Sequence, residues 1–318
     1  MFNSFDIWKA LAGVAIFLLG VRFLEESLQQ LAGRKFKLYL KKQTSSKFKA
    51  IGGGAVVTAI LQSSSVVSLM VLAFVGAGII SMQNALAVIL GANLGTTVTG
   101  WLVALAGFNM NIENLALPVA GISGLGFAVF DRNSKWYNWC RFLLGFSFLF
   151  IGLGYMKTGI EGLVLNLDLR QYANAPLVIF LLVGFLITSL IQSSSATVAI
   201  ILSALYAGAI TLVDGVAIVL GSEVGTTVKL FMASIKGESA KKRVALGNFL
   251  FNIITAALIL IFLLPLTNFV TDVIGIKDEL IALVFFQTFV NILGIILFYP
   301  LLGIFGRFLE NRFLNDND

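Results

Sequence analysis

Two short polar motifs interrupt an apolar sequence, and each of them occurs twice. The first is Gln-Ser-Ser-Ser, at 62–65 and again at 192–195. Consecutive hydroxyls and backbone N–H groups at the start of a helix favour an anion, because the helix dipole places partial positive charge there. We therefore predict that phosphate or sulfate binds at the eight residues of the two motifs, which are Gln62, Ser63, Ser64, Ser65, Gln192, Ser193, Ser194 and Ser195.

The second motif is Gly-x-x-x-Gly-Thr-Thr, at 91–97 and again at 221–227. Glycine allows a helix to unwind, and the freed carbonyl oxygens and the Thr hydroxyls suit an oxygen-ligated cation such as sodium. Small residues also line ordinary helix contacts in membranes, so a single copy of either motif carries little weight. An anion motif that is paired with a cation motif, both of them duplicated, is typical of a symporter.

Two charged residues distinguish the second copy of these motifs from the first. Glu223 and Lys229 stand where the first copy has Asn93 and Thr99. A carboxylate at membrane depth is costly and marks a candidate functional residue. Three roles remain open for Glu223: it adds charge to a sodium site, it carries a coupled proton, or it pairs with Lys229.

Other polar residues have simpler explanations. Glu25 and Glu26 lie toward the end of the first span, and we expect them to be solvated or paired with the basic stretch 34–49. Asn248 and Asn252 are four residues apart on one helix face, where we expect them to hydrogen-bond between helices.

The motifs belong to a longer internal repeat. Residues 58–105 align with residues 188–235 without a gap, and sixteen of the 48 positions are identical. A weaker similarity relates the first span near Gly20 to the sequence near Gly152. Such a repeat predicts two copies of one structural unit.

The distribution of charge predicts how the two copies lie in the membrane. Seven Lys and Arg residues and no acidic residue fall in the loop 34–49, so the positive-inside rule places it in the cytoplasm. The segment 109–114 is then outside. Because these two loops lie on opposite sides, the chain between them must cross the membrane an odd number of times. It contains two apolar stretches, so one of them must enter and leave the membrane on the same side, as a re-entrant segment. The stretch that Gln62–Ser65 divides has arms too short to span about 30 Å.

The predicted fold class is therefore an all-α membrane protein with two inverted-topology repeats, each with a re-entrant helical hairpin and a broken transmembrane helix, plus one C-terminal span. Repeat 1 covers 1–136, with its hairpin at 50–77 and its broken helix at 84–108. Repeat 2 covers 137–270, with its hairpin at 172–207 and its broken helix at 215–235. Residues 271–318 hold the last span and a short tail.

The predicted crossings are 8–33, 84–108, 115–130, 141–157, 215–235, 244–266 and 280–304. Seven crossings put the N-terminus outside and the C-terminus in the cytoplasm. The predicted location is the cell (inner) membrane, with the lipid bilayer as the surrounding partner.

The composition excludes most other classes of function. Of the 318 residues, 58% are hydrophobic and 12% are charged, against about 25% charged in soluble domains. The mean hydropathy is +0.95. The chain has no His and one Cys, Cys140, so imidazole catalysis, disulfide frameworks and Cys-rich metal sites are absent. The basic stretches serve topology, and we predict no nucleic-acid partner.

The quoted motifs make the chain resemble the type II sodium/phosphate cotransporter family, and KKRVALGNFLFN at 241–252 is similar to a further segment of that family. The resemblance covers residues 10–305. It implies sodium-coupled transport of inorganic phosphate by alternating access, with the Gln-Ser-Ser-Ser residues at the phosphate and with no cofactor besides the coupling sodium ions. The residues that it assigns to cations are Asn93, Thr96, Thr97, Thr226 and Thr227, beside Glu223, which stands where the family usually has Asn.

The function that we predict is sodium-coupled symport of inorganic phosphate, by a transporter and not an enzyme. A homodimer remains open. The alternatives are a proton-linked or uncoupled phosphate exporter, a carrier of another oxyanion, and, from a different class, an anion channel. An intramembrane enzyme is remote, because without His only Glu223 and Lys229 offer proton-transfer groups beside the serines.

Overall fold

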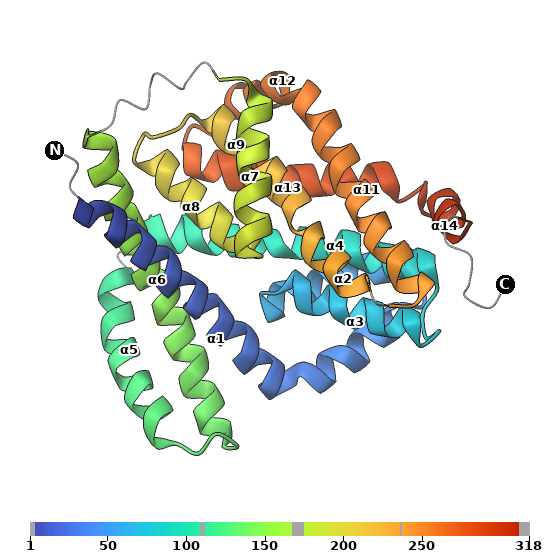
Figure 1. Cartoon of the computed structure of the whole chain (residues 1–318), viewed down its shortest axis with the longest axis horizontal. Coiled ribbons are helices and arrows are strands. Elements are labelled where there is room, and N and C mark those ends of the chain that lie inside the picture. The colour runs from blue at the N-terminus through green and yellow to red at the C-terminus, as the bar shows by residue number, and fades with distance from the viewer. Residues whose placement is uncertain (1–3, 109–111, 167–174, 236, 312–318) are drawn as a thin grey trace.

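The structure is a computed structural model that describes residues 4–108, 112–166, 175–235 and 237–311, and within these ranges all regular secondary structure is helical (Figure 1). The α-helices are α1 (Ser4–Gln43), α2 (Lys47–Leu61), α3 (Ser64–Gly76), α4 (Met82–Leu102), α5 (Ile112–Val129), α6 (Lys135–Asn166), α7 (Leu177–Ile191), α8 (Ser194–Tyr206), α9 (Leu212–Gly225), α10 (Thr227–Ser234), α11 (Ser239–Ile261), α12 (Leu263–Asn268), α13 (Glu279–Phe298) and α14 (Leu302–Glu310). Two segments, η1 (Val103–Phe108) and η3 (Phe269–Val273), are π-helical. The predicted all-α class is confirmed.

Six helical stretches of the described residues are long and apolar enough to cross a membrane. They are α1, α4 with η1, α6, α9 with α10, α11 and α13. These stretches coincide with six of the seven predicted crossings and confirm a multi-pass membrane protein. The seventh, 115–130, falls on α5, whose apolar part is shorter than eighteen residues and therefore shorter than about 27 Å.

The basic stretch 34–49 is not a loop as predicted. Helix α1 continues through it to Gln43, and α2 begins at Lys47. Figure 1 shows that α1 bends along its course. Lys and Arg are good helix formers, so a basic composition can mark one side of the membrane without ending the helix. The last predicted span, 280–304, ends earlier than predicted, because α13 stops at Phe298 and α14 follows as a separate helix.

Each Gln-Ser-Ser-Ser motif joins two short helices, α2 to α3 and α7 to α8. Gln62 and Gln192 adopt the left-handed conformation, with φ of 53° and 58°, and end the first helix of each pair. Ser63 and Ser193 are extended and cap the second helix, through hydroxyls that accept from backbone N–H groups 3.4 and 3.3 Å away. The predicted division of both stretches is therefore confirmed. Residues 172–174 of the second stretch lie outside the described residues.

The predicted break at Gly91–Thr97 is wrong, because α4 runs through this segment without interruption. In the second copy the helix is interrupted at Thr226, which keeps right-handed helical angles and donates its N–H to the Ser222 carbonyl at 3.1 Å. The glycines have another use. A Cβ on Gly91 would collide with the Ile51 carbonyl oxygen of α2. They allow α4 and α2 to pack with their backbones in close contact, and this packing does not require the helix to unwind.

The same close approach recurs in the second copy. A Cβ on Gly221 would collide with the Leu181 carbonyl oxygen of α7. Gly221 is the counterpart of Gly91 in the gapless alignment, and Leu181 follows Ile51 by the same 130 residues. Helix α9 therefore packs on α7 as α4 packs on α2.

Helices α1 and α6 pack together through a second set of glycines. A Cβ on Gly13 would lie 2.7 Å from the Gly152 carbonyl oxygen, and a Cβ on Gly20 would lie 2.7 Å from that of Gly145. The two helices are therefore antiparallel. Gly13 corresponds to Gly145, and Gly20 to Gly152, in the weaker similarity between the first span and α6. Gly13 thus contacts the counterpart of Gly20, and Gly20 contacts the counterpart of Gly13. A two-fold axis between two equivalent units produces reciprocal contacts of this kind.

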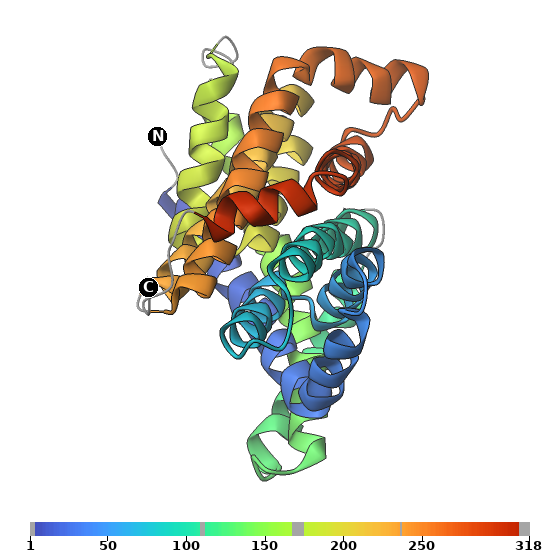
Figure 2. The ribbon, with the colours of Figure 1, turned by 90° about the vertical axis from the view of Figure 1, so that its right-hand side faces the viewer.

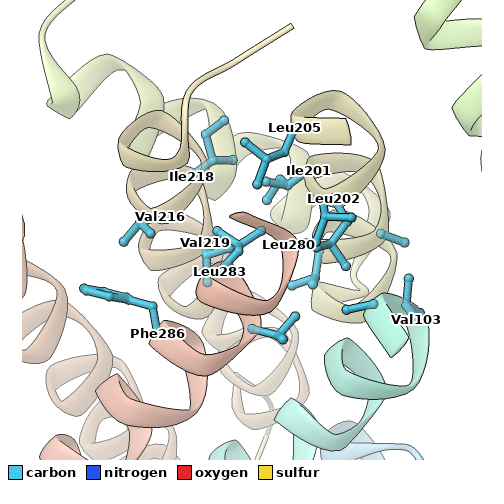
Figure 3. Close-up of a cluster of buried hydrophobic side chains, with 14 of the residues drawn as sticks. Val103, Ile201, Leu202, Leu205, Val216, Ile218, Val219, Leu280, Leu283 and Phe286 are labelled. Carbon is cyan, nitrogen blue, oxygen red and sulfur yellow. The ribbon is translucent and has the colours of Figure 1, made fainter. Parts of the chain in front are cut away.

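The larger hydrophobic core joins α8, α9 and α13. Leu202, Val219 and Leu283 pack there together with Val103 of η1 (Figure 3). Figure 2 shows α2, α3 and α4 on one side of the molecule and α7, α9 and α11 on the other. Helix α13 contacts both α4 and α9. Helix α13 therefore links the two sets of helices.

Candidate functional site

One cavity of about 520 Å³ brings both Gln-Ser-Ser-Ser motifs together. All eight residues of the motifs line it, although the two copies are far apart in the sequence. Thr96 of α4 and Thr226 line the same cavity, and α1 forms one of its walls. The tertiary structure thus assembles one anion-suited site from two distant segments.

Two helix N-termini face this cavity. Helices α3 and α8 begin at Ser64 and Ser194, and both of these residues line it. The first turn of a helix presents backbone N–H groups without partners in the helix, and each N-terminus acts as about half a positive charge. Both ends favour an anion. The Ser63 and Ser193 hydroxyls already cap these helices, so the hydroxyls of Ser64, Ser65, Ser194 and Ser195 are better placed to bind a ligand.

The two Gln residues of the motifs differ in their surroundings. The Gln62 amide is held at both ends: its Nε2 donates to the Ala59 carbonyl at 2.5 Å, and its Oε1 accepts from the Thr99 hydroxyl at 2.8 Å. Gln192 is exposed, and the counterpart of Thr99 is Lys229, which lines the cavity. The second motif therefore offers the anion a more available amide and a nearby ammonium group.

Four charged side chains line the cavity that were not predicted to do so: Arg22, Glu25 and Glu26 of α1, and Lys229 of α10. The Glu26 carboxylate accepts from Arg22 Nε at 2.8 Å and from Arg141 Nη1 at 2.9 Å. Of the two outcomes predicted for Glu26, solvation holds in part, since its side chain is 39% exposed, but its ion pairs are with Arg22 and Arg141 and not with the stretch 34–49. Lys229 could have been predicted as a site residue, because it departs from its counterpart Thr99 in the repeat. No comparable indication in the sequence marks Arg22, Glu25 or Glu26.

Glu25 is half-buried at the wall of the cavity. Its carboxylate lies beside the Ser63 hydroxyl and within electrostatic reach of Lys229. The cavity therefore places one carboxylate and one ammonium group near the predicted anion site, and an entering anion would compete with Glu25 for Lys229.

The six predicted cation residues fall into three groups. Asn93 and Glu223 line a separate, small pocket of about 30 Å³. Thr96 and Thr226 line the large cavity. Thr97 and Thr227 line neither of these, and their buried hydroxyls donate to the carbonyl oxygens of Leu94 and Val224 in their own helices. The structure thus brings two of the six together with a space of ionic size.

The pairing of Glu223 with Lys229 does not occur. Glu223 is 7% exposed and accepts from Gln287 Nε2 of α13 at 2.9 Å. Lys229 lines the large cavity instead, and no ion pair joins it to Glu223 within the described part of the chain. The helical residues between them turn the two side chains toward different spaces. Asn252 does hydrogen-bond between helices, since it accepts from Asn93 of α4 at 3.4 Å.

The sequence profile of the Na+/Pi-cotransporter family matches residues 16–158 and 166–289 of this chain. The chain belongs to this family. The two matched segments cover most of both repeats, including the Gln-Ser-Ser-Ser motifs at the large cavity.

Several known proteins are similar to this member of the family. The uncharacterized protein YqeW of Bacillus subtilis is 31% identical over 299 residues, which cover 93% of this chain and 95% of that protein. YjbB of Salmonella typhimurium, whose name assigns it provisionally to inorganic phosphate export, is 26% identical over 96% of this chain. The chain spans 55% of the length of that protein.

A shorter similarity links the family member to an animal protein. The human sodium-dependent phosphate transport protein 2C is 46% identical over 59 residues, which are 19% of this chain and 10% of the human protein. No solved structure matches the chain.

Proposed function

We propose that this protein is a secondary active transporter that moves inorganic phosphate across the cell (inner) membrane together with sodium. The observation that supports it is the single cavity lined by both Gln-Ser-Ser-Ser motifs. Phosphate is a tetrahedral oxyanion, and two helix N-termini, four well-placed serine hydroxyls and Lys229 surround the space with donors and positive charge. Phosphate transport is also the activity in the names of several relatives.

Alternating access through two inverted repeats is the proposed mechanism. The equivalent packing of α2 on α4 and of α7 on α9, and the reciprocal antiparallel contact of α1 with α6, support a two-fold axis perpendicular to these helices. An axis of that direction would lie in the membrane plane and would make each motif part of a re-entrant hairpin that opens to one side. The N-terminus would then be outside and the C-terminus in the cytoplasm.

The cavity itself lies where the two repeats meet. Its lining includes matched residues of both copies, such as Thr96 with Thr226 and Ser64 with Ser194. A substrate there touches both hairpin tips, so a movement of either hairpin would open the site to one side. Of the six residues predicted for sodium, Asn93 and Glu223 share a pocket, so sodium would bind there and would lower the electrostatic cost of moving the anion.

The test is transport of labelled phosphate by the purified protein in liposomes, with a sodium gradient in either direction and with choline in place of sodium. We expect saturable phosphate movement that follows the sodium gradient in both orientations. Equal rates in sodium and in choline would refute sodium coupling. The same assay identifies the alternatives: a response only to a pH gradient indicates proton coupling, and unsaturable flux indicates an anion channel.

Substrate choice is tested in the same liposomes by competition. Arsenate has the shape and charge of phosphate, whereas sulfate carries no exchangeable proton at neutral pH. We expect arsenate to compete and sulfate not to compete. Competition by sulfate alone would assign the cavity to another oxyanion.

A further inference from the structure

The small pocket at Glu223 is formed by both repeats at once. Four of its lining residues are two matched pairs: Leu90 with Leu220, and Asn93 with Glu223. The members of each pair occupy equivalent positions in the gapless alignment of the two copies. A space that is lined by both members of each pair lies between the two copies, and residues of α11 and α13 complete its lining.

Three asparagine side chains line this pocket, and each of them carries an amide oxygen. The Asn93 amide donates to Asn252 Oδ1 at 3.4 Å, the Asn252 amide donates to Asn248 at 2.9 and 3.0 Å, and the Asn291 amide donates to the Gln287 carbonyl at 3.0 Å. All three side chains line the pocket. Each NH₂ group already has at least one acceptor in the protein, and each carbonyl oxygen has two lone pairs, so these oxygens can serve as ligands.

Glu223 would add a negative charge to these oxygens when a bound cation keeps it ionised. One of its carboxylate oxygens, Oε1, accepts from Gln287 Nε2, and the hydroxyl-bearing Thr255 lines the same pocket. A buried carboxylate that has hydrogen bonds but no ion pair within the described residues is costly, and a bound cation would remove that cost.

The size of the pocket limits what can bind. Its volume of about 30 Å³ is enough for one or two water-sized spheres, since one such sphere needs about 10–15 Å³. The pocket is far smaller than the large cavity of about 520 Å³, which favours a single small ion there and phosphate in the large cavity. One carboxylate matches a monovalent ion, because calcium sites use six to eight oxygens with several carboxylates.

A third, smaller cavity shares lining residues with this pocket and with the large cavity. Its volume is about 20 Å³, and Asn93 lines both it and the Glu223 pocket. Ser64, Ser65 and Thr226 line both it and the large cavity. Polar side chains therefore continue from the anion-suited cavity to the Glu223 pocket, so a charge bound at one end can be sensed at the other.

We propose that the Glu223 pocket binds one monovalent cation of the size of sodium, held by the Glu223 carboxylate and by the side-chain oxygens of Asn93, Asn252, Thr255 and Asn291. This inference deepens the proposed function and rests on it, since the ion would be the coupling ion. Asn291 lies on α13, outside both repeats, so the ion joins α4, α9, α11 and α13. The binding of one ion would stabilise the arrangement of both repeats where they meet.

The direct test is the sodium dependence of the melting temperature of the purified protein, without phosphate, in sodium chloride and in choline chloride at equal ionic strength. We expect sodium to raise the melting temperature of the wild-type protein, because a ligand that binds only the folded state stabilises it. Glu223→Gln keeps the shape and can still accept from Gln287, and we expect it to lose this sodium response. The matched control is Asp272→Asn, which removes one carboxylate from an exposed segment and should keep it.

A second variant guards against loss of folding. Thr255→Val keeps the carboxylate and the volume but removes one oxygen ligand, and we expect the sodium concentration for half of the effect to rise by about tenfold. A sodium response that is unchanged in both variants would overturn the inference. A response to acidification in place of sodium would also overturn it and would make Glu223 a proton carrier.

The failure of this inference can be told apart from failure of the proposed function. Binding of inorganic phosphate, measured by calorimetry in a fixed sodium concentration, reports on the large cavity. If wild-type protein binds phosphate and sodium drives its transport, but Glu223→Gln keeps the sodium-induced rise in melting temperature, then only the location of the cation site is wrong. If the wild-type protein neither binds nor transports phosphate, the proposed function itself is wrong.

Discussion

Removal of one hydroxyl from the large cavity tests the anion site at a single atom. Ser194 is 6% exposed, lines the cavity and is the first residue of α8. The cap of α8 is the neighbouring Ser193, so Ser194→Ala leaves the cap in place. We therefore expect a small change in stability, within about 0.5 kcal/mol, as is usual for a substitution that disturbs no core contact or cap.

The expected effect on phosphate binding is much larger. A hydrogen bond to a charged acceptor contributes about 1.5–3 kcal/mol. Since about 1.4 kcal/mol corresponds to a tenfold change in affinity, the dissociation constant for phosphate should rise about 10- to 150-fold. The assay is calorimetric titration of the purified protein with inorganic phosphate in constant sodium chloride. Ser64→Ala, the same change in the first motif, should have an effect of similar size.

A matched control lies on the same helix. Ser203 is buried in α8, donates to the Ala199 carbonyl at 2.9 Å and does not line the cavity. Ser203→Ala should lower the melting temperature slightly and leave phosphate affinity unchanged. If Ser194→Ala and Ser203→Ala bind phosphate equally well, the serine hydroxyls do not form the anion site and the reasoning is refuted.

Three further changes test other parts of the site. Lys229→Met removes an ammonium group from the cavity and should weaken phosphate binding at least about tenfold in the same titration, whereas an unchanged affinity would exclude Lys229 from the site. Ser193→Ala removes the cap of α8 and should lower stability to unfolding by about 0.5–2 kcal/mol, measured by denaturant titration, and a stability equal to wild type would contradict that role. Gly221→Ala should lower the melting temperature and weaken phosphate binding, because the added Cβ would collide with the Leu181 carbonyl oxygen. The control is Gly52→Ala, whose added Cβ meets no atom within 4 Å and should leave binding unchanged. Equal behaviour of the two variants would count against the close packing of α7 and α9.

Much of the organisation could be predicted from local sequence. The apolar composition, the spans and the interval of the repeat are properties of residue type and order, and they do not depend on distant contacts. The division of each of the two apolar stretches at Gln-Ser-Ser-Ser was also predictable, because Ser is a strong helix cap and a polar run divides an apolar helix. These features can therefore be predicted without a structure.

Other features were predicted wrongly because they depend on neighbours in space. Gly91 suggested an unwound helix, but α4 is continuous there and Gly91 packs against the Ile51 carbonyl of α2. In the second copy the helix is interrupted at Thr226, while Gly221 packs against the Leu181 carbonyl of α7. Sequence alone cannot distinguish a glycine that permits unwinding from one that permits close packing, since both need the absence of a Cβ. The same limit explains Glu26, whose partner Arg141 is 115 residues away.

The sequence by itself determined the membrane class, the duplicated motifs and the residue types suited to an anion and a cation. The tertiary structure alone decided which of these residues share a space. It placed Glu223 with Asn93, Asn252 and Asn291 in one small pocket, and Lys229 with the serines in the large cavity. The physical reason is that side chains a few residues apart on a helix point in different directions, so the site of each depends on which helices pack around it.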